Sequence, residues 1–235
     1  MPLINAAPYR LPPLSGTQPV LLMHMEGSSI VDSTGRHTFT NNGGANLNTS
    51  QKVFGTQSLQ LTGNSVQLPV TTPNHDDFDL GSQDWTIELA VYPTVAATGQ
   101  VLGTWRTGAA YSWAIISSTS GYFGLCYSVS GSYESANERG SYNVAPINTW
   151  TRIAFVRSDA VLRMYVNGTY VPFAFGGNNI GSGTKIFKSL GAFVIGGNND
   201  NQRFTGFIDE VRITKGTALY TGASYTLATE AFPNP

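Results

Sequence analysis

The segment from Thr149 to Phe173 constrains the fold more than any other part of this sequence. Apolar side chains recur there at every second position in two consecutive runs, at Ile153 and Phe155 and then at Leu162, Met164 and Val166. Successive side chains of a strand point to opposite faces of a sheet, so this period of two predicts two half-buried strands.

A third run begins directly after Asn167-Gly168. Asn-Gly between alternating runs is the strongest short-range signal for a β-hairpin, because a type I′ turn needs a positive φ at both central residues. We therefore predict an antiparallel meander in the middle of the chain, with the other segments paired to it or packed across from it.

Many further short strands are predicted on either side of the meander. One of them, residues 85–93, alternates with Trp85, Ile87, Leu89 and Val91 on one face. No stretch longer than a turn or two has the period of a helix, and 26 glycines and 12 prolines in 235 residues suit a chain with many turns. Regularly spaced strands separated by turn residues predict one all-β antiparallel sandwich over residues 20–235.

Residues 1–19 are predicted to form an arm outside the sandwich. The segment carries five prolines, which favour an extended, polyproline-like chain over a helix or a central strand. Because the strand pattern begins only after Pro19, we expect the arm to join the domain to an assembly rather than to contribute to its core.

Charge and cysteine content narrow the classes of function. The formal net charge is −1 and only 11% of residues are charged, so there is no electrostatic reason to expect binding to nucleic acid or an anionic membrane. No apolar run approaches the roughly 20 residues of a membrane span. The single Cys126 lies in an alternating run and is predicted to be buried and unreactive. Prolines near the N-terminus interrupt the apolar stretch of a signal peptide, which favours cytoplasmic synthesis without export.

Several segments, taken together and in order, resemble the laminin-G-like branch of the concanavalin A-like lectin/glucanase superfamily. The resemblance extends over residues 20–233, nearly the whole chain, and is carried by LLMHMEG (21–27), VDSTG (31–35), FGTQSLQLTGNSVQLP (54–69), DWTIELAVYP (84–93), NTWTRIAFVR (148–157), LRMYVNGT (162–169) and FTGFIDEVRITKGTALYTGASYTLATEAFP (204–233). It implies a jelly-roll sandwich of two curved antiparallel sheets. The ending EVRITKGTALYT…AFP is most similar to versions found in bacteriophage virion proteins.

The residues expected for catalysis are absent from the sequence pattern. Glucanases of the superfamily carry their acid pair in a Glu-x-Asp-x-x-Glu pattern, which does not occur here. Glu88 stands alone in its strand, and Asp209 and Glu210 are adjacent, so their side chains are predicted to point to opposite faces. The histidines at positions 24, 37 and 75 are scattered without metal-ligand spacing. We expect a protein that is not an enzyme and has no catalytic residues.

A structural calcium ion is the cofactor that the resemblance implies. Asp209 matches the late Asp of the superfamily's calcium site, and Asp32 and Glu26 are the early acidic residues that would approach it, although Asp is commoner than Glu at position 26. Alternation predicts Phe207, Asp209 and Val211 on one face, so Asp209 is expected to be partly buried and to need a partner. The alternative is that Asp209 accepts backbone N–H bonds and pins a turn.

Carbohydrate binding is indicated by a region rich in aromatic and amide side chains. We take Trp105, Tyr111, Tyr133 and Asn137 as candidate ligand-binding residues. The same region also contains Trp113, Tyr122, Tyr127, Glu138 and Arg139. The alternative for each aromatic residue is a purely structural role in the core or on a strand face.

These observations predict that the chain is a non-enzymatic structural protein of a bacteriophage virion. The expected role is that of a decoration protein that displays a lectin-like module on the head surface. Its expected partners are capsid or other virion proteins, contacted through the arm, together with host-surface glycans; a homo-oligomer is compatible with this interpretation. The alternative function is a carbohydrate-binding module of a tail or fibre that recognises host glycans. A glycan-cleaving enzyme is the third function considered.

Overall fold

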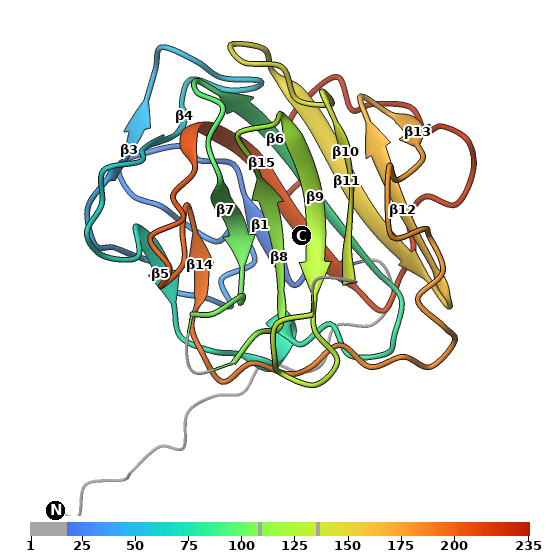
Figure 1. The fold of residues 1–235 in the computed structure, drawn as a ribbon. Coiled ribbons are helices and arrows are strands. Elements are labelled where there is room, and N and C mark those ends of the chain that lie inside the picture. The colour runs from blue at the N-terminus through green and yellow to red at the C-terminus, as the bar shows by residue number, and fades with distance from the viewer. Residues whose placement is uncertain (1–17, 108–109, 135–136) are drawn as a thin grey trace, which may run out of the picture.

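The computed structural model describes residues 18–107, 110–134 and 137–235, which form two antiparallel sheets packed face to face (Figure 1). Sheet A has the strand order β13 (Thr169–Val171), β12 (Val161–Val166), β11 (Thr151–Ser158), β6 (Trp85–Pro93), β15 (Thr205–Lys215), β4 (Ser58–Thr62) and β3 (Ala45–Asn48), and β1 (Leu21–Met23) also pairs with β15. Sheet B has the order β10 (Glu138–Tyr142), β9 (Tyr122–Tyr127), β8 (Trp113–Ser117), β7 (Gly99–Gly103), β14 (Phe193–Ile195), β5 (Val70–Thr72) and β2 (Thr40–Asn41). The predicted all-β sandwich is confirmed.

The predicted meander, β11 to β13, forms one side of sheet A, with β13 as the edge strand. Strand β11 pairs with β6 on one side and with β12 on the other, so that Ile153 lies opposite Leu89 and Val166. Ile153 and Phe155 face the core between the sheets, whereas Ala154 and Val156 belong to a separate cluster on the outer face. The period-two interpretation of this segment is therefore correct on both faces.

Large aromatic side chains fill the core between the sheets. The ring of Phe78, from the 3-10 helix η1 (Asp76–Phe78), stacks on Phe193 of β14 with centroids 4.3 Å apart. Trp113 of β8 is fully buried, and its Nε1 donates to the Phe78 carbonyl at 2.8 Å. This bond satisfies the one polar atom of the indole, which would otherwise be costly to bury.

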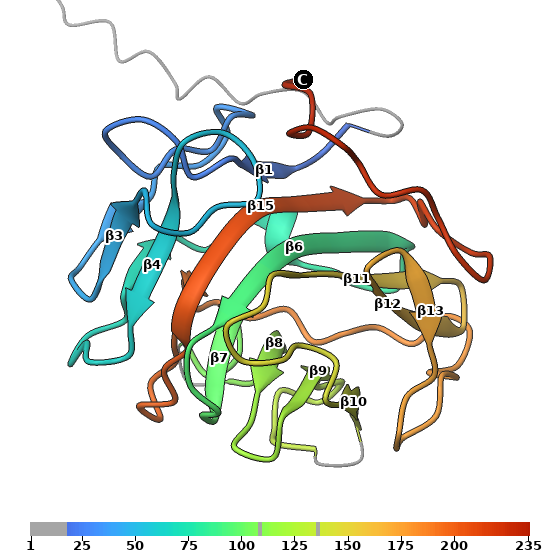
Figure 2. The same cartoon turned by 90° about the horizontal axis from the view of Figure 1, so that it is seen from above.

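The outer face of sheet A is covered by the chain that follows β15 (Figure 2). Tyr220 and Tyr225 stack with centroids 3.6 Å apart, and both rings pack edge-on against Tyr165 of β12. The Tyr165 hydroxyl donates to the Gly222 carbonyl at 2.8 Å. The C-terminal segment, residues 216–235, therefore covers the outer face of sheet A. The outer face of sheet B is the more open of the two.

A β-bulge in β15 overturns one prediction. The register against β6 shifts between Asp209 and Arg212, and Glu210 within the bulge has φ +49°. The extra residue reverses the alternation, so that Val211 joins the core while Phe207 packs outside it against Tyr92. Phe207, Asp209 and Val211 do not share a face, because simple alternation fails across a bulge.

The predicted arm, residues 1–19, falls almost wholly outside the described residues, which begin at Gln18. Among the residues that are described, no helix is long and apolar enough to cross a membrane.

Cys126 is buried as predicted, and burial raises the pKa of its thiol.

The predicted type I′ turn is present between β12 and β13. Val166 pairs with Thr169 across the two-residue loop, in which Asn167 has φ +48° and Gly168 has φ +80°. A Cβ on Gly168 would lie 2.6 Å from the carbonyl oxygen of Tyr225 in the C-terminal segment. Gly168 is therefore needed both for the turn and for the close approach of that segment.

We expect Gly168→Val to lower the free energy of unfolding by about 1–3 kcal/mol, because a β-branched residue is strained at positive φ. Thr169→Val, at an exposed strand position, should be tolerated. Urea unfolding of the two variants measures the difference. Equal shifts in midpoint would contradict this account of the turn.

Candidate functional site

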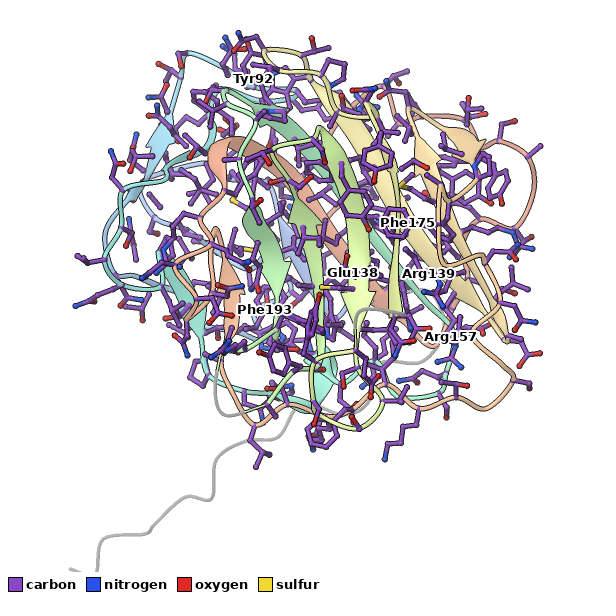
Figure 3. All side chains as sticks on the ribbon, viewed as in Figure 1. Tyr92, Glu138, Arg139, Arg157, Phe175 and Phe193 are labelled. Carbon is purple, nitrogen blue, oxygen red and sulfur yellow. The ribbon has the colours of Figure 1, made fainter. Side chains whose placement is uncertain are left out.

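The outer face of sheet B carries a band of side chains that do not enter the core. Ile115, Phe123 and Leu125 point into the sandwich, whereas Ala114 and Cys126 pack on the opposite face beneath Trp105. Figure 3 shows Glu138 and Phe175 beside β9 and β10 on this side of the molecule. This face, at β8, β9 and β10, is the candidate site.

A cavity of about 310 Å³ opens on this face. Five aromatic rings and several hydroxyl, amide and carboxylate groups line it: Thr98, Gly99, Trp105, Ile116, Ser117, Ser118, Ser120, Tyr122, Cys126, Tyr133, Glu138, Tyr142, Phe175 and Gln202. A concave, largely apolar surface with a few polar groups is the usual form of a ligand site.

Two glycines lie beneath the Tyr122 ring, next to the cavity. Gly124 of β9 and Gly140 of β10 are directly paired. A Cβ on Gly124 would lie 2.0 Å from the Tyr122 hydroxyl oxygen, and one on Gly140 would lie 2.5 Å from a Tyr122 ring carbon. The glycines therefore let the Tyr122 ring lie flat against the sheet.

One end of the cavity is a cluster of three rings around Tyr122. Phe175 stacks on Tyr122 with centroids 5.1 Å apart and an interplanar angle of 22°. Tyr142, which lies opposite Tyr122 in the β9–β10 register, has its ring 5.8 Å from Tyr122 and 49% of its surface exposed. This end offers exposed ring faces to a ligand.

The other end contains Trp105, Tyr111 and Tyr133. Their ring centroids lie 4.7 to 6.1 Å apart. Trp105 is buried against the sheet, while Tyr133 is exposed and its hydroxyl donates to Glu138 Oε1 at 3.2 Å. This contact places the Glu138 carboxylate between the two aromatic ends of the cavity.

The hydroxyl of Tyr122 is the polar atom whose hydrogen bonding is incomplete. It is buried, and within the described part of the chain it has no hydrogen-bond partner. Burial raises the pKa of this phenol, and the nearby Cys126, Glu138 and Tyr142 raise it further, so the phenol stays protonated. A buried donor without a protein partner is a group that a water molecule can satisfy.

The structure brings together three of the four predicted ligand-binding residues. Trp105 and Tyr133 line the cavity, and Tyr111 packs against both from behind. Asn137 does not line it; its backbone N–H and its side-chain amide both donate to Glu134.

The wider aromatic region divides between the two faces of sheet B. Tyr122 and Glu138 line the cavity. Trp113 and Tyr127 are core residues, and Arg139 is buried with its guanidinium 5.6 Å from the Tyr127 ring. The alternative of a structural role is correct for Trp113 and Tyr127.

Two aromatic residues of the cavity, Tyr142 and Phe175, were not among those singled out from the sequence. Tyr142 shares its face with Glu138 and Gly140, so a period-two interpretation of residues 138–142 would have found it. Phe175 reaches the cavity from the loop after β13, and no local sequence pattern places it there.

The three carboxylates predicted to bind calcium accept hydrogen bonds at two places. Asp209 Oδ2 accepts from the backbone N–H of Val53 at 2.8 Å, and Glu26 Oε1 accepts from the backbone N–H of Thr56 at 2.7 Å, so both hold the loop from residue 53 to 57. Asp32 closes a different loop, where its Oδ2 accepts from the backbone N–H of His37 at 3.1 Å. The alternative stated for Asp209, a carboxylate that pins a turn, matches these contacts.

A second cavity, of about 260 Å³, lies between sheet A and the C-terminal segment. Two of its charged groups, Glu88 and Arg212, already bind each other: Arg212 Nε contacts Glu88 Oε2 at 2.6 Å, and the Tyr220 hydroxyl donates to Glu88 Oε1 at 2.6 Å. These contacts hold the segment in place and leave the cavity with few polar groups for a ligand.

A sequence model of the Concanavalin A-like lectin/glucanases superfamily (Laminin_G_3) matches residues 61–219. No curated protein sequence matches the chain.

Several solved structures have a similar fold. The receptor binding domain of botulinum neurotoxin D has a TM-score of 0.62 and 13% identity, with 86% of this chain and 50% of that chain covered. The binding domain of Paraclostridial Mosquitocidal Protein 1 has a TM-score of 0.60 and 14% identity, with 86% and 49% covered. Domain 4 of AbnA, an extracellular arabinanase of Geobacillus stearothermophilus solved with arabinotriose, has a TM-score of 0.56 and 19% identity, with 86% and 94% covered. The chain spans about half the length of the two toxin domains, and at these identities the likeness shows the fold alone.

We expect the stability that Asp209 contributes to depend on pH. Burial raises the pKa of Asp209 to about 7, above the roughly 4 of an unfolded chain. Between these values the folded protein binds more protons than the unfolded one, so the contribution of Asp209 falls as pH rises from 4 to 7. The stability lost in Asp209→Asn should therefore shrink over this range, by on the order of 1 kcal/mol per pH unit at most. Urea unfolding at several pH values tests this, and a loss independent of pH would contradict it.

Calcium remains a prediction from the resemblance, and chelation tests it. A bound calcium ion requires that EDTA lower the melting temperature and that added calcium restore it by mass action. If EDTA has no effect while Asp209→Asn still lowers the melting temperature, hydrogen bonds alone satisfy the carboxylate.

Proposed function

Because this chain belongs to the concanavalin A-like lectin/glucanases superfamily, we propose that it is a carbohydrate-binding domain whose ligand lies on the outer face of sheet B. The observation that carries the proposal is the cavity of about 310 Å³, with exposed rings at both ends and polar groups between them. The arabinotriose in the AbnA domain and the receptor binding of the neurotoxin domain give further support from the same fold.

Sugar rings and this cavity have complementary surfaces. A pyranose or furanose ring presents C–H groups that pack against aromatic faces, such as those of Tyr142 and Phe175. Its hydroxyl groups need hydrogen-bond partners, which the Glu138 carboxylate and the hydroxyl and amide groups of the lining supply. Residues 138 to 142 of β10 run between the two ends over about 13 Å. A ligand that contacts both ends is an oligosaccharide rather than a single sugar.

The charges at the site favour a neutral ligand. Among the described residues that line the cavity, Glu138 is the one ionisable carboxylate and there is no Lys or Arg. Arg106, near the rim, is engaged by Asp200 at 2.7 Å. A sialic or uronic acid would bring its own carboxylate towards Glu138 without a cation to balance it.

We also propose binding without cleavage. Retaining hydrolysis needs two carboxyl groups about 5–5.5 Å apart, and inverting hydrolysis about 6.5–9.5 Å. The described lining supplies the single carboxylate of Glu138, which already accepts a hydrogen bond from Tyr133. Incubation of the protein with bound glycans, followed by mass spectrometry, should detect no shortened product.

The binding prediction is that Tyr142→Ala and Tyr133→Ala each weaken the affinity for a neutral oligosaccharide by about fivefold, because each removes a stacking contact worth about 1 kcal/mol. Leu190→Ala is the matched control, since Leu190 is 83% exposed and lies outside the cavity. A glycan array selects the ligand, and calorimetry measures the three variants. Equal affinities across the variants, or a preference for sialylated glycans, would contradict the proposed site.

Display on a bacteriophage head is the second part of the proposal. Its support is the resemblance of the ending EVRITKGTALYT…AFP, within residues 210–233, to virion proteins, a stretch that includes most of the C-terminal segment packed on sheet A. The expected location is the virion surface, after synthesis in the host cytoplasm, with attachment to capsid or other virion proteins through residues 1–19.

Deletion of residues 1–19 should leave the melting temperature of the domain nearly unchanged and abolish its co-sedimentation with particles. Immuno-electron microscopy of purified particles locates the full chain on head or tail. Unchanged incorporation of the truncated chain would contradict attachment through the arm.

A further inference from the structure

We propose that His37, His75 and Asp77 form a binding site for a divalent transition-metal ion of the Zn²⁺ class. Their spacing in the sequence gives no sign of a metal site, and we expected the histidines to be scattered. The fold brings one ligand atom of each residue within 4.8 Å of the other two. Asp77 Oδ2 lies 3.2 Å from His37 Nε2 and 3.1 Å from His75 Nδ1.

The two distances from Asp77 Oδ2 are close to those of a tetrahedral zinc site, and the two imidazole nitrogens lie within 4.8 Å of each other. Zinc binds His nitrogen and carboxylate oxygen at about 2.0–2.2 Å, so two ligand atoms of a tetrahedron lie about 3.3–3.5 Å apart. The two distances from Asp77 Oδ2 need to lengthen by only a few tenths of an ångström. Three protein ligands leave the fourth position to water, and imidazole with carboxylate suits zinc, nickel or copper rather than calcium.

Neighbouring residues fix the orientation of the ligands. The backbone N–H of His37 donates to Asp32, and the His37 ring packs against Phe78 with centroids 4.6 Å apart. His75 is the N-cap residue of η1, and its Nδ1 accepts from the backbone N–H of Asp77 at 3.1 Å. The ligands therefore come from two loops that are each held in place before an ion binds.

Arg36 orients the carboxylate and also competes with the metal. Its Nη2 donates to Asp77 Oδ1 at 3.0 Å and its Nε to Oδ2 at 2.7 Å. Burial opposes ionisation, but the hydrogen bonds from His37 and Arg36 hold the pKa of the Asp77 carboxyl well below its usual range. An ion on Oδ2 replaces the Nε contact and leaves the Nη2 contact as a support for the carboxylate.

The site is closed on one side and open on the other. The His37 side chain is 2% exposed, whereas that of His75 is 46% exposed, so an ion enters past His75. Binding has a cost, because His75 Nδ1 gives up the Asp77 N–H and His37 Nε2 gives up its contact with the Val20 carbonyl at 3.1 Å. This cost and the charge of Arg36 lead us to expect a modest affinity and a structural role, linking the loop at residues 32–37 to η1.

The test uses the full chain without a histidine tag. The melting temperature is measured in EDTA, in ZnCl₂ and in CaCl₂, for the wild type and two variants. His75→Asn removes the imidazole but keeps a side chain that caps η1 well. His24→Asn is the matched control, since the His24 ring contacts Glu210 and lies outside the cluster.

Zinc at about ten times its dissociation constant should raise the melting temperature of the wild type and of His24→Asn by about 3 °C or more, and calcium should not. His75→Asn should melt near the wild type in EDTA and lose the zinc response. The site is refuted if zinc has no effect on the wild type, or if the zinc response persists in His75→Asn. Because the readout is stability, the result does not depend on whether a glycan binds to sheet B.

Discussion

Glu88 and Arg212 form an ion pair on the outer face of sheet A, beneath the C-terminal segment. The pair would be costly if it were only half satisfied, because both groups lose water on burial. The Tyr220 hydroxyl donates to the carboxylate at 2.6 Å, and the Phe232 ring lies 3.8 Å from the guanidinium carbon. Both covering groups come from the C-terminal segment. The ion pair and the C-terminal segment that covers it therefore give this face of the sandwich a structural role, and the face is not free to bind a ligand.

The outer face of sheet B has the opposite character. Its glycine pair, Gly124 and Gly140, lets the Tyr122 ring lie flat against the sheet, beside a cavity that has exposed aromatic rings at both ends. The asymmetry between the two sheets is the physical reason for placing the ligand on sheet B.

Local patterns predicted the architecture, and contacts between distant segments limited the prediction of sites. The alternation from Trp85 onwards and the Asn-Gly turn are local, so they identified the sheets and the hairpin. The bulge at Asp209 inserts one extra residue into β15, and a period-two pattern in the sequence gives no sign of it. The residues after the bulge, such as Val211, therefore point to the opposite face from the one predicted. Phe175 reaches the cavity from a loop, and His37 meets His75 only because two loops converge at one end of the sandwich. Such meetings depend on the folded chain and leave no periodic signal.

The central claim is that carbohydrate binds on the outer face of sheet B. Mapping of NMR chemical-shift changes on titration with a neutral oligosaccharide tests it most directly, because the method locates the ligand without a substitution. The account predicts saturable changes at β9, at β10 and around Phe175, with little change along the C-terminal segment. Changes confined to the loops at the ends of the sandwich, or to the cavity beneath the C-terminal segment, would contradict it.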